Sequence, residues 1–159
     1  IAVTGVQTCA LPIYVFVTFE QMQKSITAND GEIAFHSRCN AVGSTKYQKH
    51  IPLIDFSTNN ETIVVEQCTT LLQEIGTNGY LFDSGRSFHL YVNTYLSHEE
   101  WIKFMGRILL MNVDEEIVDS RWVGHRLLAG YASLRLTANS DHYKKEPELI
   151  HILNGAWND

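Results

Sequence analysis

Residues 79–93 read GYLFDSGRSFHLYVN, two short apolar runs on either side of the turn residues SGRS. Runs of this kind around a glycine turn are typical of two paired β-strands. Side chains alternate along a strand, so Ser87, His89 and Tyr91 share one face and the apolar residues between them face the other way. The second strand therefore presents a hydroxyl and an imidazole together.

Helices are expected before and after this strand pair in the sequence. Residues 60–76 carry apolar residues at helical spacing, with Asn60 as N-cap and Gly76 as the stop. A capping box at Ser97 and Glu100 opens a second amphipathic helix. Further strands are expected in three β-branched or aromatic segments, and the last third is predicted as strand and loop. These segments are residues 14–19, 32–40 and 50–58, followed by the strand and loop of 122–139. The pattern predicts an α+β (mixed α/β) fold, a sheet covered by helices.

Composition excludes several classes of protein. The chain has 159 residues, 45% of them apolar and 19% charged, as in an ordinary globular domain. The net charge of −6 disfavours bulk attraction to nucleic acid but permits a local basic groove. No apolar run approaches the roughly 20 residues of a membrane helix. We therefore expect a protein without membrane contact, located in the cytoplasm.

The first residues are set aside from the prediction of the fold. The stretch VTGVQTCALPI, residues 3–13, resembles the conceptual translation of a sequencing adapter. We therefore treat residues 1–13 as a non-native segment, residues 14–153 as the core, and residues 154–159 as a tail of uncertain assignment. The core is expected to be a fragment of a longer protein.

Three places carry candidate functional side chains. Asp55 ends the apolar run IPLID, where it could hold a hard cation or cap the turn that follows. Arg86, Ser87 and His89 offer guanidinium, hydroxyl and imidazole donors suited to a polyphosphate, although a buried core histidine is an alternative. Asp119 follows a short apolar stretch and is either another ligand or the solvated edge of DEEIVDSR.

The order of these motifs resembles the archaeo-eukaryotic primase superfamily from Glu32 to Pro147. A strand ending in aspartate, a serine-x-histidine strand and an apolar stretch ending in aspartate follow one another in both. SGRSFHLYV resembles the family's lead into the histidine strand, and SLRLTANSDHYKKEP its segment after the third motif. The resemblance implies a primase-type core with an RRM-like sheet flanked by helices.

The resemblance also implies a role for each matching residue. Asp55 and Asp119 would be the catalytic carboxylates and the ligands of Mg²⁺ or Mn²⁺. The remaining residues would bind the incoming nucleotide, and they are Arg86, Ser87, His89 and Arg135.

The implied activity is that of a primase-polymerase, a nucleotidyltransferase of DNA replication. It would synthesise or extend nucleic acid from nucleoside triphosphates on a single-stranded DNA template, with a helicase or accessory domain as partner. The chain departs from the family at Ser57, where the first motif normally has a second acid. A hydroxyl is a poor replacement for a carboxylate on a divalent ion. The alternative is therefore a degenerate primase fold that binds nucleotides or nucleic acid without polymerase activity.

A third, unrelated alternative is a phosphoesterase. It would use His89 together with His36 or His125 as general acid and base.

Overall fold

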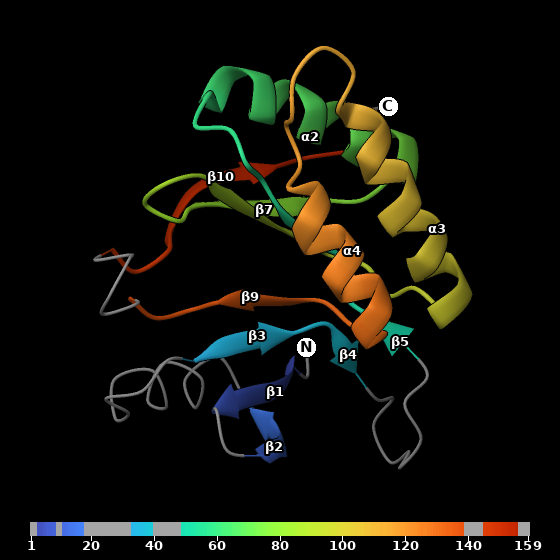
Figure 1. The fold of residues 1–159 in the computed structure, drawn as a ribbon, viewed down its shortest axis with the longest axis vertical. Helices are drawn as coiled ribbons and strands as arrows, with labels where there is room; N and C mark the ends of the chain where they lie inside the picture. Colours follow the sequence, from blue (N-terminus) through green and yellow to red (C-terminus); the bar gives the residue numbers. More distant parts are fainter. Residues whose placement is uncertain (1–2, 9–10, 18–32, 40–48, 139–144, 156–159) are drawn as a thin grey trace.

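The computed structural model of the chain describes residues 3–8, 11–17, 33–39, 49–138 and 145–155, and Figure 1 shows how their helices and strands are arranged. Helices and antiparallel sheets occur together, which confirms the expected α+β class. Within these ranges, no helix has both the length and the apolar composition of a membrane span.

The strands of the quoted hairpin lie in the middle of a four-stranded sheet, the central sheet. Strand β7 (Gly79–Asp83) pairs antiparallel with β8 (Phe88–Val92), which confirms the predicted strand pair. Strand β6 (Leu53–Asp55) pairs with β8, and β10 (Glu148–Leu153) pairs with β7. The strand order is β10-β7-β8-β6, so segments far apart in sequence lie side by side.

A second sheet has the strand order β2-β1-β3-β9, and its β3 and β9 lie below the central sheet in Figure 1. Its neighbouring strands run antiparallel. They are β1 (Val3–Thr8), β2 (Leu11–Val17), β3 (Ala34–His36) and β9 (Ser133–Arg135).

Part of the segment set aside as non-native, residues 3–8, forms a strand of the second sheet. Within β1, Val6 is in register with Phe35 and Gln7 with Ala34. An exposed strand edge accepts an extended segment through main-chain hydrogen bonds, with little demand on its side chains. The adapter-like origin of this segment stays a prediction.

A short two-stranded ladder, β4 (Arg38–Cys39) with β5 (Lys49–His50), takes part in a chain of polar contacts that is buried at Ser37 and His50. The Ser37 hydroxyl lies 3.1 Å from Nδ1 of His50, and Nε2 of His50 lies 3.1 Å from Nδ1 of His98. These contacts connect the ladder to the first turn of α3 (His98–Ile108).

The two expected helices form as predicted. Helix α2 (Glu61–Ile75) has Asn60 as its N-cap, and Gly76 ends it in the left-handed conformation with φ 71°. Helix α3 begins with the Ser97–Glu100 capping box and continues into the 3₁₀ turn η1 (Leu109–Met111). Local capping chemistry was therefore sufficient to place both helix starts.

The prediction of strand and loop over residues 122–139 is wrong for its first half. Helix α4 (Ser120–Ala129) occupies this part, and only the following β9 is a strand. Asp119 caps the helix, and Gly130 ends it with φ 74°. Gly124 is tolerated inside the helix, where a Cβ would meet nothing within 4 Å.

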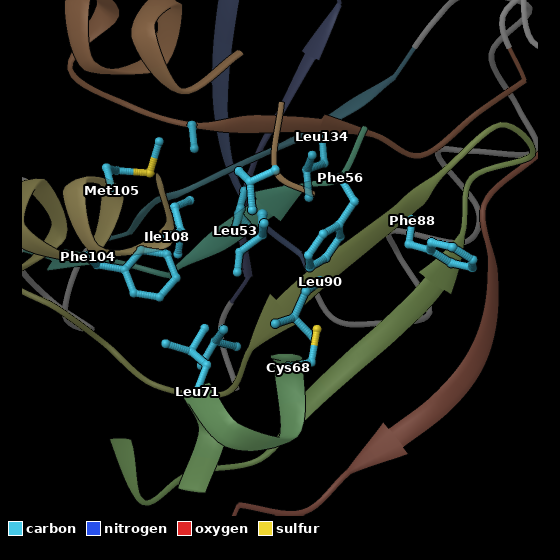
Figure 2. Close-up of a cluster of buried hydrophobic side chains, with 14 of the residues drawn as sticks. Leu53, Phe56, Cys68, Leu71, Phe88, Leu90, Phe104, Met105, Ile108 and Leu134 are labelled. Atoms are coloured by element: carbon cyan, nitrogen blue, oxygen red, sulfur yellow. The ribbon is translucent and has the colours of Figure 1, made fainter. Parts of the chain in front are cut away.

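The apolar core lies between the central sheet and helices α2 and α3. Ile54, Leu81 and Leu90 are in register across β6, β7 and β8, and all are fully buried. Figure 2 shows Leu90 of β8 among side chains from α2 and α3, such as Cys68 and Phe104. This packing fixes which face of the central sheet is apolar.

The opposite face of the central sheet is turned toward the second sheet. The rings of Phe35 on β3 and Tyr91 on β8 meet edge to face, with their centroids 5.4 Å apart. Asp55 and His89 are in register and occupy this same face, because they alternate with the buried Ile54 and Leu90. The fold therefore places these two polar side chains between the sheets.

Candidate active site

A pocket of about 260 Å³ lies between the two sheets, with α4 along one side. Figure 1 shows α4 running from the level of β7 to the level of β9. All the site residues predicted from the sequence line this pocket. Its lining consists of Asp55, Phe56, Ser57, Ser84, Arg86, Ser87, His89, Asp119, Trp122, Arg126, Ser133, Leu134 and Arg135.

Asp55 and His89 face each other across two neighbouring strands. They are direct partners in the β6–β8 ladder, with His89 Nε2 3.6 Å from Asp55 Oδ1. His89 is 5% exposed, and its Nδ1 is buried without a hydrogen-bond partner among the described residues. Strand register therefore brings the acid of the first motif against the histidine of the second.

Asp119 reaches the same place because its segment runs along the free edge of β6. The Asp119 amide donates to the Asp55 carbonyl at 3.1 Å, and Val118 forms a bridge with Phe56. Asp119 Oδ1 accepts from the Trp122 amide at 2.8 Å, which makes it the N-cap of α4. Asp119 is therefore a helix cap whose carboxylate also lines the pocket.

The charges of the pocket depend on burial. Burial, and next the neighbouring Asp119 carboxylate, raise the pKa of Asp55 to about 7, against the opposing effect of Arg135, Arg86 and Arg126. Burial, and next the charge of Arg135, lower the pKa of His89 to about 3. The imidazole is thus neutral at physiological pH, and a cation between the two carboxylates would relieve their repulsion.

The acidic residues fit one divalent ion better than two. Asp55 and Asp119 supply the oxygen ligands that a hard cation prefers. The part of the chain that the structure describes contains no group of three or more His, Cys, Asp or Glu placed to hold a metal. Ser57 takes the position of the second acid, and its hydroxyl donates to the Glu116 carbonyl at 2.5 Å.

The β7–β8 turn places donors at the pocket wall. The Gly85 amide donates to Asp83 Oδ1 at 2.7 Å, and Gly85 has φ 94°, a conformation that favours glycine. The Ser84 amide and hydroxyl both donate to the Ser87 carbonyl at 2.9 Å. This tight turn leaves Arg86 exposed and Ser87 half-buried beside the pocket.

Arg135 connects β9 to this turn. Its guanidinium donates to the carbonyl oxygens of Thr137 and Lys145, both at 2.9 Å, and to that of Ser84. These bonds hold the two walls of the pocket together. Arg135 therefore positions the turn in addition to lining the pocket.

The lining residues that the sequence analysis missed are Phe56, Ser84, Trp122, Arg126, Ser133 and Leu134. Trp122 and Arg126 project from α4, and Trp122 Nε1 donates to the Ser133 carbonyl at 3.2 Å. The signal that could have found them is helical spacing from the N-cap Asp119, because Trp122 and Arg126 follow it on one helix face. The strand-and-loop interpretation hid that spacing.

The phosphoesterase alternative loses its second imidazole. The His36 ring stacks on Tyr131 with centroids 4.3 Å apart, and His125 is exposed on α4. Neither lines the pocket, where His89 is the one histidine among the described lining residues. The described lining residues therefore contain no acid and base pair of histidines.

The fold and the pocket define an α+β protein in which two aspartates, a histidine and three arginines meet between two antiparallel sheets. A model of the archaeo-eukaryotic primase 1D-like family matches residues 17–148, and the chain belongs to this archaeo-eukaryotic primase-like family. No curated protein and no solved structure matches the chain. The family expected from the sequence is confirmed, and it points to a nucleotidyltransferase-type enzyme.

Proposed function

We propose that the chain is a primase-polymerase-like nucleotidyltransferase, which synthesises or extends nucleic acid on a single-stranded DNA template. The observation that carries this proposal is the meeting of Asp55, His89 and Asp119 in one pocket. These residues come from three separate segments, and each belongs to one of the motifs that resemble the primase superfamily. Membership of the primase-like family supports the same class of reaction.

Asp55 and Asp119 would hold Mg²⁺ or Mn²⁺ in this proposal. Primase-like proteins generally use divalent metals. A bound divalent ion lowers the pKa of an attacking hydroxyl and neutralises charge on the phosphates. Asp119 is held rigidly for this role, since the same carboxylate caps α4. Asp55 is held by the β6–β8 ladder.

His89, Ser87 and Arg86 would bind the triphosphate. Because burial keeps His89 neutral, one ring nitrogen carries a proton that can be donated to a phosphate oxygen. Ser87 contributes a hydroxyl, and Arg86 contributes a charge at the exposed turn. Arg135 would act by fixing that turn through its bond to the Ser84 carbonyl.

The local charge of the pocket suits an anionic substrate despite the net charge of −6. Three arginines and two aspartates line it, so the wall is locally basic when both carboxylates are ionised. Charge of one sign in a cleft raises the local concentration of the opposite ion. A nucleoside triphosphate is such an ion.

The test is incorporation of labelled nucleotides on single-stranded DNA with Mn²⁺ or Mg²⁺. Asp55→Asn and Asp119→Asn are the informative variants, because each removes a carboxylate charge. Asparagine at position 119 can still cap α4. We expect each to lower incorporation by about a hundredfold or more. Asp114→Asn is the matched control, an exposed aspartate outside the pocket lining.

Incorporation that survives both pocket substitutions would contradict the proposal. Nucleotide binding by the folded wild-type protein without any product would instead indicate the degenerate binding module that Ser57 suggests. If the nucleotide raises the melting temperature of the wild type and His89→Ala removes this effect, the nucleotide binds in the pocket. If the nucleotide does not stabilise the folded wild type, it does not bind.

A further inference from the structure

Arg126 lines the pocket from α4, the helix that Asp119 caps. It lies about two turns beyond Asp119, or about 10 Å along the helix axis. That separation keeps the acid and the guanidinium on the same side of the helix without joining them as an ion pair. One rigid element thus carries an anionic group and a cationic group into the same pocket.

The guanidinium of Arg126 is oriented by a hydrogen bond to β9. Its Nη1 donates to the Ser133 hydroxyl at 2.7 Å. Ser133 is itself held from the other side, since its carbonyl accepts from Trp122 Nε1. The Ser133 hydroxyl therefore aims the guanidinium while the main chain of Ser133 stays fixed by α4.

Another nitrogen of this guanidinium lacks an acceptor among the described residues. Arg126 Nε is buried without a hydrogen-bond partner in the described residues, and no described carboxylate lies within ion-pair distance of Arg126. A buried donor without an acceptor costs free energy in the empty protein. Arg107 offers a contrast, because it pairs with Glu74 at the surface.

We propose that Arg126 binds the phosphate chain of the nucleotide in this pocket, and that Ser133 is the positioning residue that orients it. This inference rests on the proposed function and adds a phosphate-binding group that the sequence motifs do not contain. With Nη1 held by Ser133 and Nε covered by the surrounding protein, Nη2 is the group left to donate to a phosphate oxygen. A hydrogen bond from a charged guanidinium to a phosphate oxygen is about twice as strong as one between neutral groups.

Arg126 also bears on the absence of a second acid at Ser57. With Asp55 and Asp119 as the acids of the described pocket, the residues fit one divalent ion. A fixed guanidinium can neutralise phosphate charge without any acidic ligands. Arg126 would therefore supply part of the positive charge that a second divalent ion supplies in a two-metal site.

The experiment is a calorimetric titration of the full chain with ATP, in Mg²⁺ and again in EDTA. We expect Arg126→Gln to weaken ATP binding about tenfold or more in both conditions. Arg126→Lys should also weaken it, since lysine keeps the charge and loses the planar group that Ser133 orients. Arg107→Gln is the matched control, a helical arginine outside the pocket, and should bind ATP as the wild type does.

Ser133 has its own pair of variants. Ser133→Ala should weaken ATP binding about threefold to tenfold, because the guanidinium loses its orienting acceptor. Ser133→Thr keeps the hydroxyl on a strand that favours β-branched residues, and should restore the affinity. This pair decides the matter if Arg126→Gln does not fold, as judged by circular dichroism.

Wild-type affinity in Arg126→Gln would overturn the inference and leave the proposed function standing. Wild-type affinity in Arg126→Lys would overturn the oriented guanidinium contact, since charge alone would then suffice. No ATP binding by the folded wild type would overturn both this inference and the proposed nucleotide site.

Discussion

Asp55 is a carboxyl group whose surroundings oppose its charge. Its pKa rises from 3.8 to about 7 because the side chain is buried and faces Asp119. The folded state therefore binds more protons than the unfolded state between these two values, and stability falls as pH rises through this window. Above about pH 7 the ionised Asp55 destabilises the metal-free protein, a cost that a bound cation would remove.

We therefore expect Asp55→Asn to stabilise the metal-free protein while it lowers nucleotide incorporation by about a hundredfold or more. At about pH 8 in EDTA the gain should be about 2 kcal/mol, from removal of a buried charge. Near pH 4 the gain should vanish, because Asp55 is then protonated in the folded state. Urea unfolding at the two pH values measures this, and an Asn variant less stable than the wild type at pH 8 would contradict it.

Ser57 is the residue on which the number of metal ions depends. Ser57→Asp would place a third carboxylate on the strand face of Asp55, at the cost of the bond to the Glu116 carbonyl. We expect Mn²⁺ to bind about tenfold more tightly, and the metal-free protein to lose about 1 kcal/mol through repulsion between like charges. Titration followed by electron paramagnetic resonance gives the affinity, with Ser57→Asn as the uncharged control. Unchanged Mn²⁺ affinity would place the ion away from Ser57.

At the scale of elements, α4 is the part of the pocket that could not be predicted from the sequence. Gly124 and Gly130 bracket a stretch that looks broken, and glycines usually indicate turns. Only Gly130 acts in this way, since its φ is positive, whereas Gly124 lies in open space on the helix. Asp55, Ser87 and His89 were found because strand alternation is a local property. Arg126 was missed because its place depends on a helix that local signals did not reveal.

This difference between the two glycines can be measured. Gly124→Ala should stabilise the protein by about 0.5–1 kcal/mol, because alanine restricts the unfolded chain and fits the helix. Gly130→Ala should destabilise it by about 1 kcal/mol or more, since φ is 74° and a Cβ would lie 3.1 Å from Arg38 Nη2. Denaturant unfolding of both variants tests the assignment of α4, and a destabilising Gly124→Ala would contradict it.

At the scale of the whole molecule, the pocket exists because two sheets face each other. The contact of Asp55 with His89 depends on the register of β6 against β8, and Arg135 reaches Ser84 from the second sheet. Such pairings join residues far apart in the chain, and no local pattern determines them. From the sequence, the meeting of these residues could be inferred only because the order of their motifs resembles that of a known family.

Buried histidines couple the second sheet and its ladder to pH. Burial, and next Arg38, lower the pKa of His36 to about 4, and burial, and next His98, do the same for His50. Both values lie below 6.5, so the unfolded state binds more protons between about pH 4 and 6.5. The stability that these neutral histidines contribute is therefore lost as pH falls through that window. Asp55 acts in the opposite direction over nearly the same range.

The histidine effect is best isolated in Asp55→Asn, where the opposing carboxyl is absent. We expect this protein to lose about 2 kcal/mol of unfolding free energy between about pH 7 and pH 5. Adding His50→Gln should reduce that loss by about a third, because one of the three buried histidines with lowered pKa values (His36, His50 and His89) is gone. Its absolute stability should also fall, since the chain from Ser37 to His98 is interrupted. His125→Gln, at an exposed histidine of α4, is the control for the slope. An unchanged pH slope in the His50 variant would show that the pKa of the His50 imidazole is the same in the folded and unfolded states.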